Sequence, residues 1–409
     1  MSEQVSPTEL RARFAEALST LYGREVPAYT TLVEVSQEVN AEVLARGGHD
    51  AERLGSIERV TAERHGAIRV GSAHELAQVA RVFGACGMYP VGFYDLREAR
   101  PAIPVVSTAF RPVDRAELAS NPFRVFTSVL VVDDRRFFDE GTEAELREFL
   151  GARTLFAPEL LELADRMERD GTLTSGDADR FLALATAAFE LSPEPVDREW
   201  YQRLEAISSV AADIGGVAST HINHLTPRVL DIDELYTRMQ QRGIEMIDRI
   251  QGPPRTDPGH PDVLLRQTSF RALAEPRRFR EPDGSVVTGD LSVRFGEVEQ
   301  RGVALTPEGR ELYDAEGIGS LPDDEAELDA RDLAYYVRGA DGGLTPIVYE
   351  DFLPKSAAGI FASNLTGEGR SDASRRAAAR DAAWMQDVLG RELHDPYALY
   401  EAERREASR

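Results

Sequence analysis

The sequence predicts an α+β fold with two modules, each made of a strand, a helix and further strands, and with a layer of helices between them. The chain has 409 residues, which is more than one ordinary domain contains. Extended, β-rich segments and amphipathic helical segments occur together in both parts, whereas the stretch between them is almost purely helical. We therefore divide the chain into residues 1–139, 140–210, 211–368 and 369–409.

The first module is expected to open with helices and continue with strands. Helices are predicted over residues 7–23, 31–46 and 72–83. The first of them has a Ser6-Pro7 start signal and repeats apolar residues on one face. Strands are predicted around Val70 and over residues 90–96, 105–111 and 123–132. From the strand at Val70 onwards, the order is strand, helix and then three strands.

A similar order returns in the second module. We expect a strand over residues 220–226, a helix beginning after Asp231-Ile232-Asp233, and strands over residues 264–273 and 291–303. A hairpin turn is predicted at Asp283-Gly284, between the last two strands. The duplication rests on element order alone, since the two modules share no residue-level repeat. The tail from residue 369 to 409 is predicted to be helical and well solvated.

Charge and cysteine content exclude several classes of protein. The formal balance of 47 basic and 71 acidic residues gives a net charge of −24, which repels nucleic acids and anionic membranes. The single cysteine, Cys86, allows no intrachain disulfide. The N-terminus is polar, and no run of about 18 apolar residues occurs. We expect a cytoplasmic protein that binds neither nucleic acid nor membrane.

Histidines and glutamates in the second module could form a metal site. His221 and His224 lie three residues apart, so on a strand only one of them can point inward. Glu297 and Glu299 share one face of a later strand, where a carboxylate needs either an arginine or a metal as its partner. A salt-bridged sheet face would satisfy this pattern. So would a site of two histidines and one carboxylate, which leaves open positions on Fe(II).

Two more segments carry residues suited to a site. His65 precedes a glycine, which would allow close approach of a ligand, and Arg69 could bind a carboxylate bidentately. The alternative is an ordinary loop histidine beside a surface arginine. Of the 47 basic residues only Lys355 is a lysine, and it lies in an apolar segment suited to lining a pocket. No companion motif supports a Schiff-base role for this lysine.

Five separated motifs resemble the 2-oxoadipate dioxygenase/decarboxylase family, over roughly residues 10 to 390. The motifs are HGAIR at residues 65–69, VGFYDL at 91–96, THINHLTPRVLDID at 220–233, FGEVEQRGVALTPEGR at 295–310 and FLPKSAAGIF at 352–361. Their number and order make the resemblance specific at family level. The resemblance implies a fold similar to the vicinal-oxygen-chelate proteins, in which βαβββ modules form an open barrel around a metal.

The resemblance also implies roles for individual residues. Fe(II) would be held by His65, Glu297 and His224, with His221 and Glu299 as the alternatives for the last two. Arg69 matches the family's substrate-binding arginine. Lys355 and Ser356 lie in the turn that matches the family's pocket loop, where the lysine could engage a distal carboxylate of the substrate.

The implied reaction converts 2-oxoadipate, or a close 2-oxo acid, with O₂ to 2-hydroxyglutarate and CO₂ in lysine catabolism. A 2-oxo acid would chelate the ion through its keto and carboxylate oxygens and leave one position for O₂. Two other functions remain open at this point. One is a non-redox metal-dependent lyase or isomerase on the same scaffold, and the other is a metal-free protein that binds a dicarboxylate.

Overall fold

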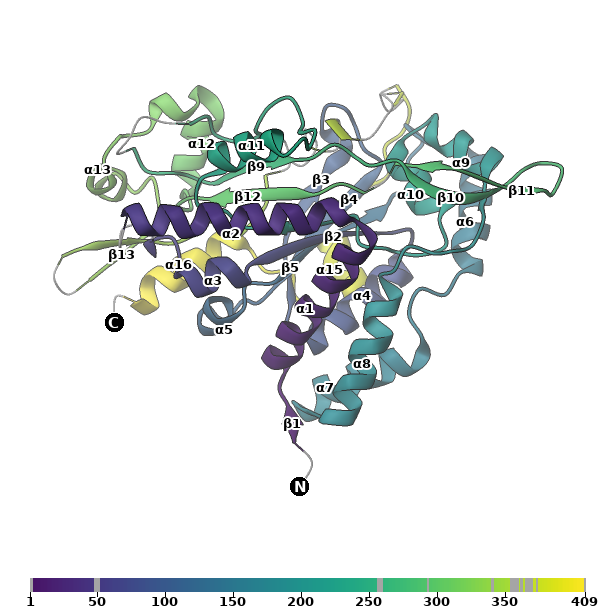
Figure 1. The fold of residues 1–409 in the computed structure, drawn as a ribbon, viewed down its shortest axis with the longest axis horizontal. Helices are drawn as coiled ribbons and strands as arrows, with labels where there is room; N and C mark the ends of the chain where they lie inside the picture. The colour runs from purple at the N-terminus through teal and green to yellow at the C-terminus, as the bar shows by residue number, and fades with distance from the viewer. Residues whose placement is uncertain are drawn as a thin grey trace.

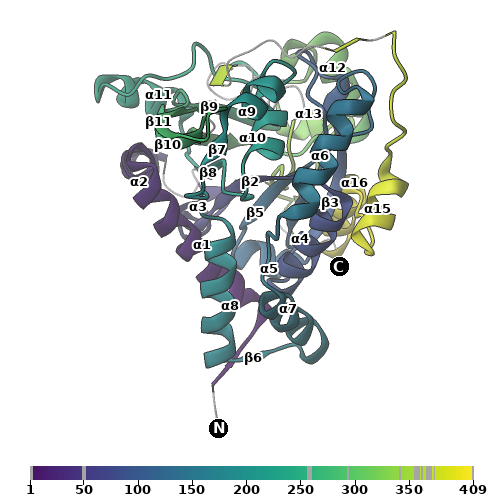
Figure 2. The same ribbon diagram turned by 90° about the vertical axis from the view of Figure 1, so that its right-hand side faces the viewer.

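A mixed β-sheet of five strands forms the centre of the molecule, in the order β3-β4-β5-β2-β8 (Figures 1 and 2). It is seen in a computed structural model, which describes residues 3–47, 52–255, 260–292, 294–339, 342–353, 360, 363–364, 371–372 and 374–407. The sheet joins the two predicted modules, because β2 of the first pairs with β8 of the second.

The first module has the predicted order of one strand, one helix and three strands. Its elements are β2 (Arg64–Val70), α4 (Ala73–Ala85), β3 (Tyr89–Asp95), β4 (Val105–Arg111) and β5 (Arg124–Leu130). Strand β5 lies parallel to β2 and antiparallel to β4, which is itself antiparallel to β3. Ser72 caps α4 by accepting a hydrogen bond from the backbone N–H of Glu75, so the helix starts directly after β2.

The second module repeats this order with an insertion. Its main elements are β8 (His224–Pro227), α11 (Ile232–Gln241), β9 (Leu265–Ser269) and β12 (Glu297–Arg301). The segment between α11 and β9 forms two isolated antiparallel bridges, from Gln251 to Gln267 of β9 and from Met246 to Phe270 just after β9. Strands β9 and β12 are antiparallel, and a parallel bridge between Arg228 and Glu299 ties β12 to the end of β8. The hairpin β10 (Glu275–Arg280) and β11 (Val286–Leu291) is inserted between β9 and β12.

Helices surround these modules. Before the first module lie β1 (Gln4–Val5), α1 (Pro7–Glu25), α2 (Pro27–Gly47) and α3 (Ile57–Ala62). Inside it are the short helices η2 (Leu96–Glu98) and α5 (Arg115–Ser120). Between the modules lie α6 (Glu140–Ala152), α7 (Pro158–Asp170), β6 (Leu173–Thr174), α8 (Ser175–Ala188), β7 (Val196–Asp197), α9 (Arg198–Glu205) and α10 (Ser209–Gly216). After β12 come α12 (Pro307–Glu316), η3 (Ile318–Ser320), α13 (Glu325–Ala330), β13 (Tyr336–Arg338), β14 (Leu344–Pro346), α15 (Ala382–Leu389) and α16 (Pro396–Ala407).

The two faces of the central sheet bury different sets of side chains. On the outer face, Ile68 and Val129 pack with apolar residues of α1, α4, α7 and α8. On the inner face, Ala67 and Phe126 pack with α6, α9 and α10 and with Phe352. Because side chains alternate along a strand, His65 and Arg69 lie on the same inner face as Ala67. We call this surface the inner face below.

The structure corrects two details of the predicted elements. The expected strand over residues 291–303 is split, because β11 ends at Leu291 and β12 begins at Glu297. The turn at Asp283-Gly284 does occur, but it joins β10 to β11 rather than the two strands that pair beside the site. The tail is also less solvated than predicted. Tyr400 of α16 is buried and contacts Asp351.

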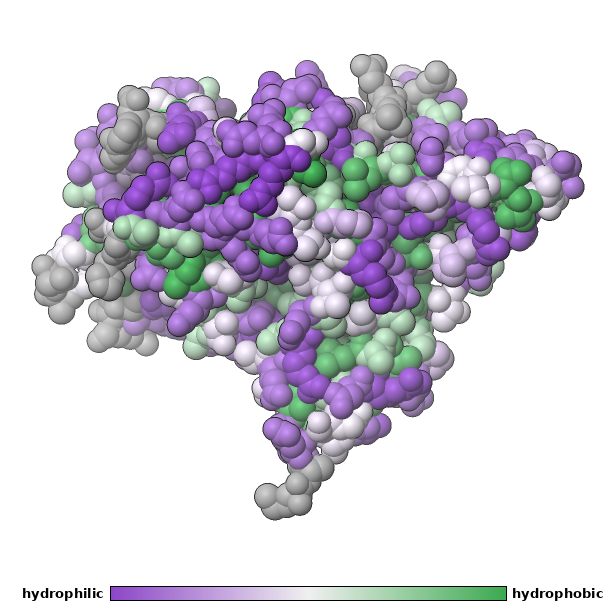
Figure 3. Space-filling model, viewed as in Figure 1, coloured by the Kyte–Doolittle hydropathy of each residue, from purple (hydrophilic) through white to green (hydrophobic). Residues whose placement is uncertain are grey.

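The outward face of α2 is largely hydrophilic (Figure 3). Within the described residues, no helix combines the length and the apolar character that a transmembrane segment requires.

Close backbone packing at Gly302, directly after β12, gives the first prediction. A Cβ at Gly302 would overlap the backbone of Asp262 and Val263. Gly302→Ala should therefore destabilise the protein by about 1–3 kcal/mol, as overpacking does in other cores. Denaturant unfolding measures this. Gly151→Ala is the control, because Gly151 lies in α6 with nothing near its missing Cβ. A Gly302→Ala protein as stable as the wild type would contradict the packing seen here.

Candidate metal centre

Three predicted side chains meet on the inner face: His65, His224 and Glu297. Each can offer a ligand atom such that all three atoms lie within 4.8 Å of one another, and all three residues are buried. His65 is the second residue of β2, whereas His224 and Glu297 begin β8 and β12. Strands from both modules are therefore needed to assemble the cluster.

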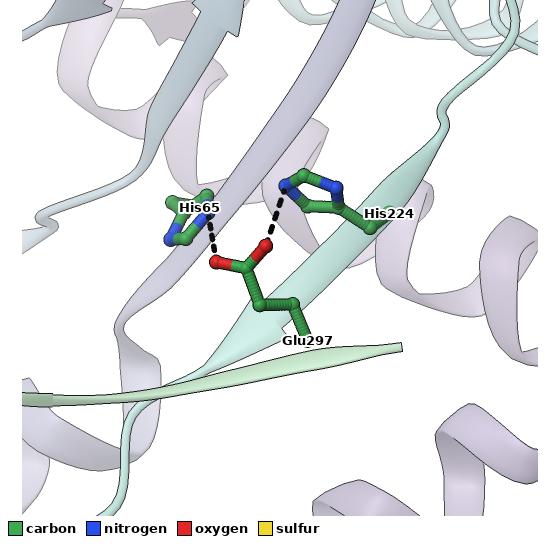
Figure 4. Close-up of side chains that lie close together, drawn as sticks. All are labelled: His65, His224 and Glu297. Atoms are coloured by element: carbon green, nitrogen blue, oxygen red, sulfur yellow. Dashed lines mark ion pairs between the residues drawn. The ribbon is translucent and has the colours of Figure 1, made fainter. Parts of the chain in front are cut away.

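The carboxylate of Glu297 lies between the two imidazoles (Figure 4). Its Oε1 is 3.3 Å from Nε2 of His65, and its Oε2 is 3.6 Å from Nε2 of His224. The second distance is too long for a hydrogen bond. Gln267 of β9 donates a hydrogen bond to Oε1 and so orients the carboxylate. Two imidazole nitrogens and a carboxylate facing one another are a donor set suited to a divalent first-row transition metal.

His224 has the properties expected of a metal ligand. Both of its ring nitrogens are buried and make no hydrogen bond within the described part of the chain. Leaving such a group unsatisfied is costly. Burial, together with the positive charges of His65 and Arg69, holds the pKa of His224 well below its ordinary value. The imidazole is thus neutral near pH 7, which is the state that binds metals.

Glu299 contacts the other side of His65. Its Oε2 lies 2.8 Å from Nδ1 of His65, so Nδ1–H donates to this carboxylate and Nε2 is left facing Glu297. Burial opposes ionisation, but Arg301 and His65 lower the pKa of Glu299 to about 2. The expectation that Glu297 and Glu299 share one face of the strand is confirmed, since both reach the same imidazole.

Glu299 belongs to a buried group of charged side chains, which we call the arginine–glutamate network. Its members are Arg59, Glu63, Arg124, Arg228, Glu299, Arg301 and Glu350. Arg301 binds Glu299 through two nitrogens, at 2.7 and 2.9 Å. Arg124 forms an ion pair with Glu63 at 2.8 Å and donates a hydrogen bond to Glu350 at 2.5 Å. Every carboxylate of the network therefore has a cation beside it, which offsets the cost of burial.

Aromatic rings line the candidate metal centre. The ring of Phe352 meets His65 edge to face, with centroids 5.0 Å apart, and Phe295 lies 5.2 Å from His224. Phe126 packs against Phe352 at 4.9 Å. These rings limit the access of water to the cluster and strengthen the electrostatic interactions inside it.

Arg69 and His221 meet at a different carboxylate. Arg69 donates to Asp213 of α10, and His221 lies 3.1 Å from the other oxygen of Asp213. His221 and Arg69 keep the pKa of Asp213 low in spite of its burial. His221 is therefore placed beside Asp213 rather than beside Glu297. Sequence reasoning missed Asp213, although a single acidic residue within the apolar segment of α10 was a usable signal, since a buried carboxylate needs a partner.

The remaining predicted site residues, Lys355 and Ser356, lie outside the described residues. Their expected place in a pocket loop stays a prediction. The residues just before them, Glu350 to Leu353, are buried against the network and the candidate metal centre.

Comparison with known proteins gives consistent results. A 2-oxoadipate dioxygenase/decarboxylase from Mycobacterium bovis is 59% identical and aligns over 98% of both chains. The crystal structure of the hydroxyglutarate synthase from Pseudomonas putida in complex with 2-oxoadipate superposes with a TM-score of 0.84 at 37% identity, covering 100% of this chain and 98% of that one. A more distant structure, of a protein described as a member of the glyoxalase superfamily from Ralstonia eutropha, shares the fold. Its TM-score is 0.55 at 21% identity, over 74% of this chain and 86% of that one.

These findings agree with the five motifs and with the α+β architecture predicted from the sequence. Residues 14–364 match the sequence profile of the 2-oxoadipate dioxygenase/decarboxylase family. The chain therefore belongs to the 2-oxoadipate dioxygenase/decarboxylase family.

Proposed function

We propose that the chain is an Fe(II)-dependent enzyme that converts 2-oxoadipate and O₂ to 2-hydroxyglutarate and CO₂. The observation that carries the proposal is the cluster of His65, His224 and Glu297, in which the neutral His224 has no hydrogen-bond partner among the described residues. In the overall reaction, the 2-oxo acid loses its first carbon as CO₂. The two atoms of O₂ remain in the product, one in the new carboxylate and one in the hydroxyl group.

The three clustered residues would hold the ion, and the strands of the two modules would form an open barrel around it. When bound, Fe(II) would be chelated by the 2-oxo acid and would activate O₂. Residues around the ion would orient its ligands and exclude water. Glu299 fixes the tautomer of His65, and the aromatic rings keep water away from the reacting groups.

Arg69 would bind a carboxylate of the substrate, and Asp213 would orient its guanidinium. Roles for Lys355 and Ser356 in binding the substrate, a place in lysine catabolism and a cytoplasmic location remain predictions from the sequence.

Loss of a ligand should abolish the reaction. Protein loaded with Fe(II) without oxygen, then mixed with 2-oxoadipate and O₂, is expected to consume O₂ and release equimolar CO₂ and 2-hydroxyglutarate. Alanine at His65, His224 or Glu297 should reduce O₂ uptake by about 100-fold or more, since loss of a metal's outer-shell partner alone costs 10–100-fold. An oxygen electrode and product chromatography measure this.

His74→Ala is the matched control, because His74 is exposed on α4, away from the cluster. Its O₂ uptake should equal that of the wild type. Turnover with Zn²⁺ in the absence of O₂ would instead favour a non-redox lyase or isomerase. If the wild type binds 2-oxoadipate equally well without metal and turns nothing over, a metal-free binding protein is the better description.

Removing the charge of Glu299 should weaken metal binding while leaving all three ligands in place. In Glu299→Gln, the buried Arg301 loses the closer of its two anionic partners, Glu299 and Glu63, and Nδ1–H of His65 loses a charged acceptor. We expect Fe(II) affinity to fall about 10- to 100-fold, measured by metal titration. Glu316→Gln, at an exposed position at the end of α12, should leave the affinity unchanged. Equal Fe(II) affinity in both variants would show that Glu299 does not support the ligand.

A further inference from the structure

Two serine hydroxyls are buried on the same inner face as the candidate metal centre. Ser107 of β4 and Ser128 of β5 are cross-strand partners, and their Oγ atoms lie 2.8 Å apart. The register places the pair relative to the site. His65 is paired with Arg124, Ala67 with Phe126 and Arg69 with Ser128. Ser128 is therefore the residue directly across from Arg69.

The surface between the serines and the cluster is apolar. Along β5, Phe126 lies between Arg124 and Ser128 on this face, and Ala109 of β4 lies beside Phe126. Hydroxyl groups placed beyond such a surface need a polar partner.

The two serine hydroxyls can donate one hydrogen bond to a further group. A serine hydroxyl has one O–H donor and two acceptor positions. Two hydroxyls that share one hydrogen bond use one of their two protons, and the other proton can be donated to a third group. Within the described part of the chain, neither hydroxyl makes a further hydrogen bond. Ser107 is fully buried and Ser128 is 3% exposed, so Ser128 is the slightly more accessible of the two.

We propose that Ser128, supported by Ser107, donates a hydrogen bond to the distal carboxylate of the substrate and so selects dicarboxylic 2-oxo acids. This inference rests on the proposed function. Ser107 donates to Ser128, and Ser128 turns its own proton to the carboxylate. Arg69, across from Ser128, supplies the positive charge on the neighbouring strand.

The spacing along β2 suits this role. His224 is paired with Ala67, and Arg69 lies two strand positions further along, a step of about 6.6 Å. Four carbon–carbon bonds of about 1.5 Å each separate the keto carbon of 2-oxoadipate from its distal carboxylate, which is roughly 5 Å in an extended chain. A substrate held at the cluster by its 2-oxo end can therefore extend toward Arg69 and Ser128.

The test compares two acids of equal length, 2-oxoadipate and the monocarboxylic 2-oxohexanoate. Dissociation constants are measured without oxygen on Fe(II)-loaded protein, and kcat and KM are measured with oxygen. Ser128→Ala should weaken binding of 2-oxoadipate about 10-fold or more, as expected for a lost hydrogen bond to a charged group, and weaken 2-oxohexanoate less than about twofold. Ser107→Ala should have a smaller effect in the same direction, because Ser128 keeps its own hydroxyl.

Thr127→Val is the matched control. Thr127 is the neighbour of Ser128 on β5 but points to the other face, and its buried hydroxyl has no hydrogen-bond partner within the described residues. This variant should leave the ratio of the two dissociation constants unchanged. If Ser128→Ala does not fold, Ser128→Cys keeps the size of the side chain with a weak donor, and the same loss of preference is expected.

Equal weakening of both acids by Ser128→Ala, or no weakening of either, would overturn the role of Ser128. In that case a wild type that still binds and oxidises 2-oxoadipate would leave the proposed function standing. A wild type that binds neither acid in the presence of Fe(II) and consumes no O₂ would overturn both proposals.

Discussion

Backbone hydrogen bonds between β2 and β8 join the two modules, and the positions of the clustered side chains follow from this pairing. Ala67 is paired with His224, so neighbouring strands carry His65 and His224 with ring centroids 5.3 Å apart. The bridge between Arg228 and Glu299 then ties β12 to the end of β8, and Glu297 starts that strand. A shift of one residue in the β2–β8 register would move the histidines to opposite faces of the sheet.

Charge burial is the second constraint on the site. The arginine–glutamate network has four arginines against three glutamates, all of them little exposed or fully buried. Arginine suits this position better than lysine, because its planar group stays charged and binds carboxylates through two nitrogens. The cations allow Glu299 to remain ionised beside His65. The strong preference for arginine in the composition thus has a structural use in at least this part of the fold.

Three regions with different chemistry follow one another along the inner face. The arginine–glutamate network occupies one end, the cluster of His65, His224 and Glu297 lies in the middle, and Arg69 with Ser128 occupies the other end. Each region is set by the two-residue repeat of the strands, which returns to the same face every second position. Because of this repeat, the central sheet and the strands beside it place the three regions in one row along the inner face.

The sequence alone determined the α+β class, most element positions and the family, because periodicity, turn signals and five ordered motifs are local properties. It also supplied the candidate ligands, yet it left His221 against His224 and Glu297 against Glu299 open. Only the tertiary structure shows which of these residues lie together. His221 contacts Asp213, and Glu299 contacts Nδ1 of His65, whereas Glu297 lies beside Nε2 of His65 and His224 lies in the same cluster. Such contacts join residues distant in sequence, and their geometry depends on strand register and helix packing, which no local pattern specifies.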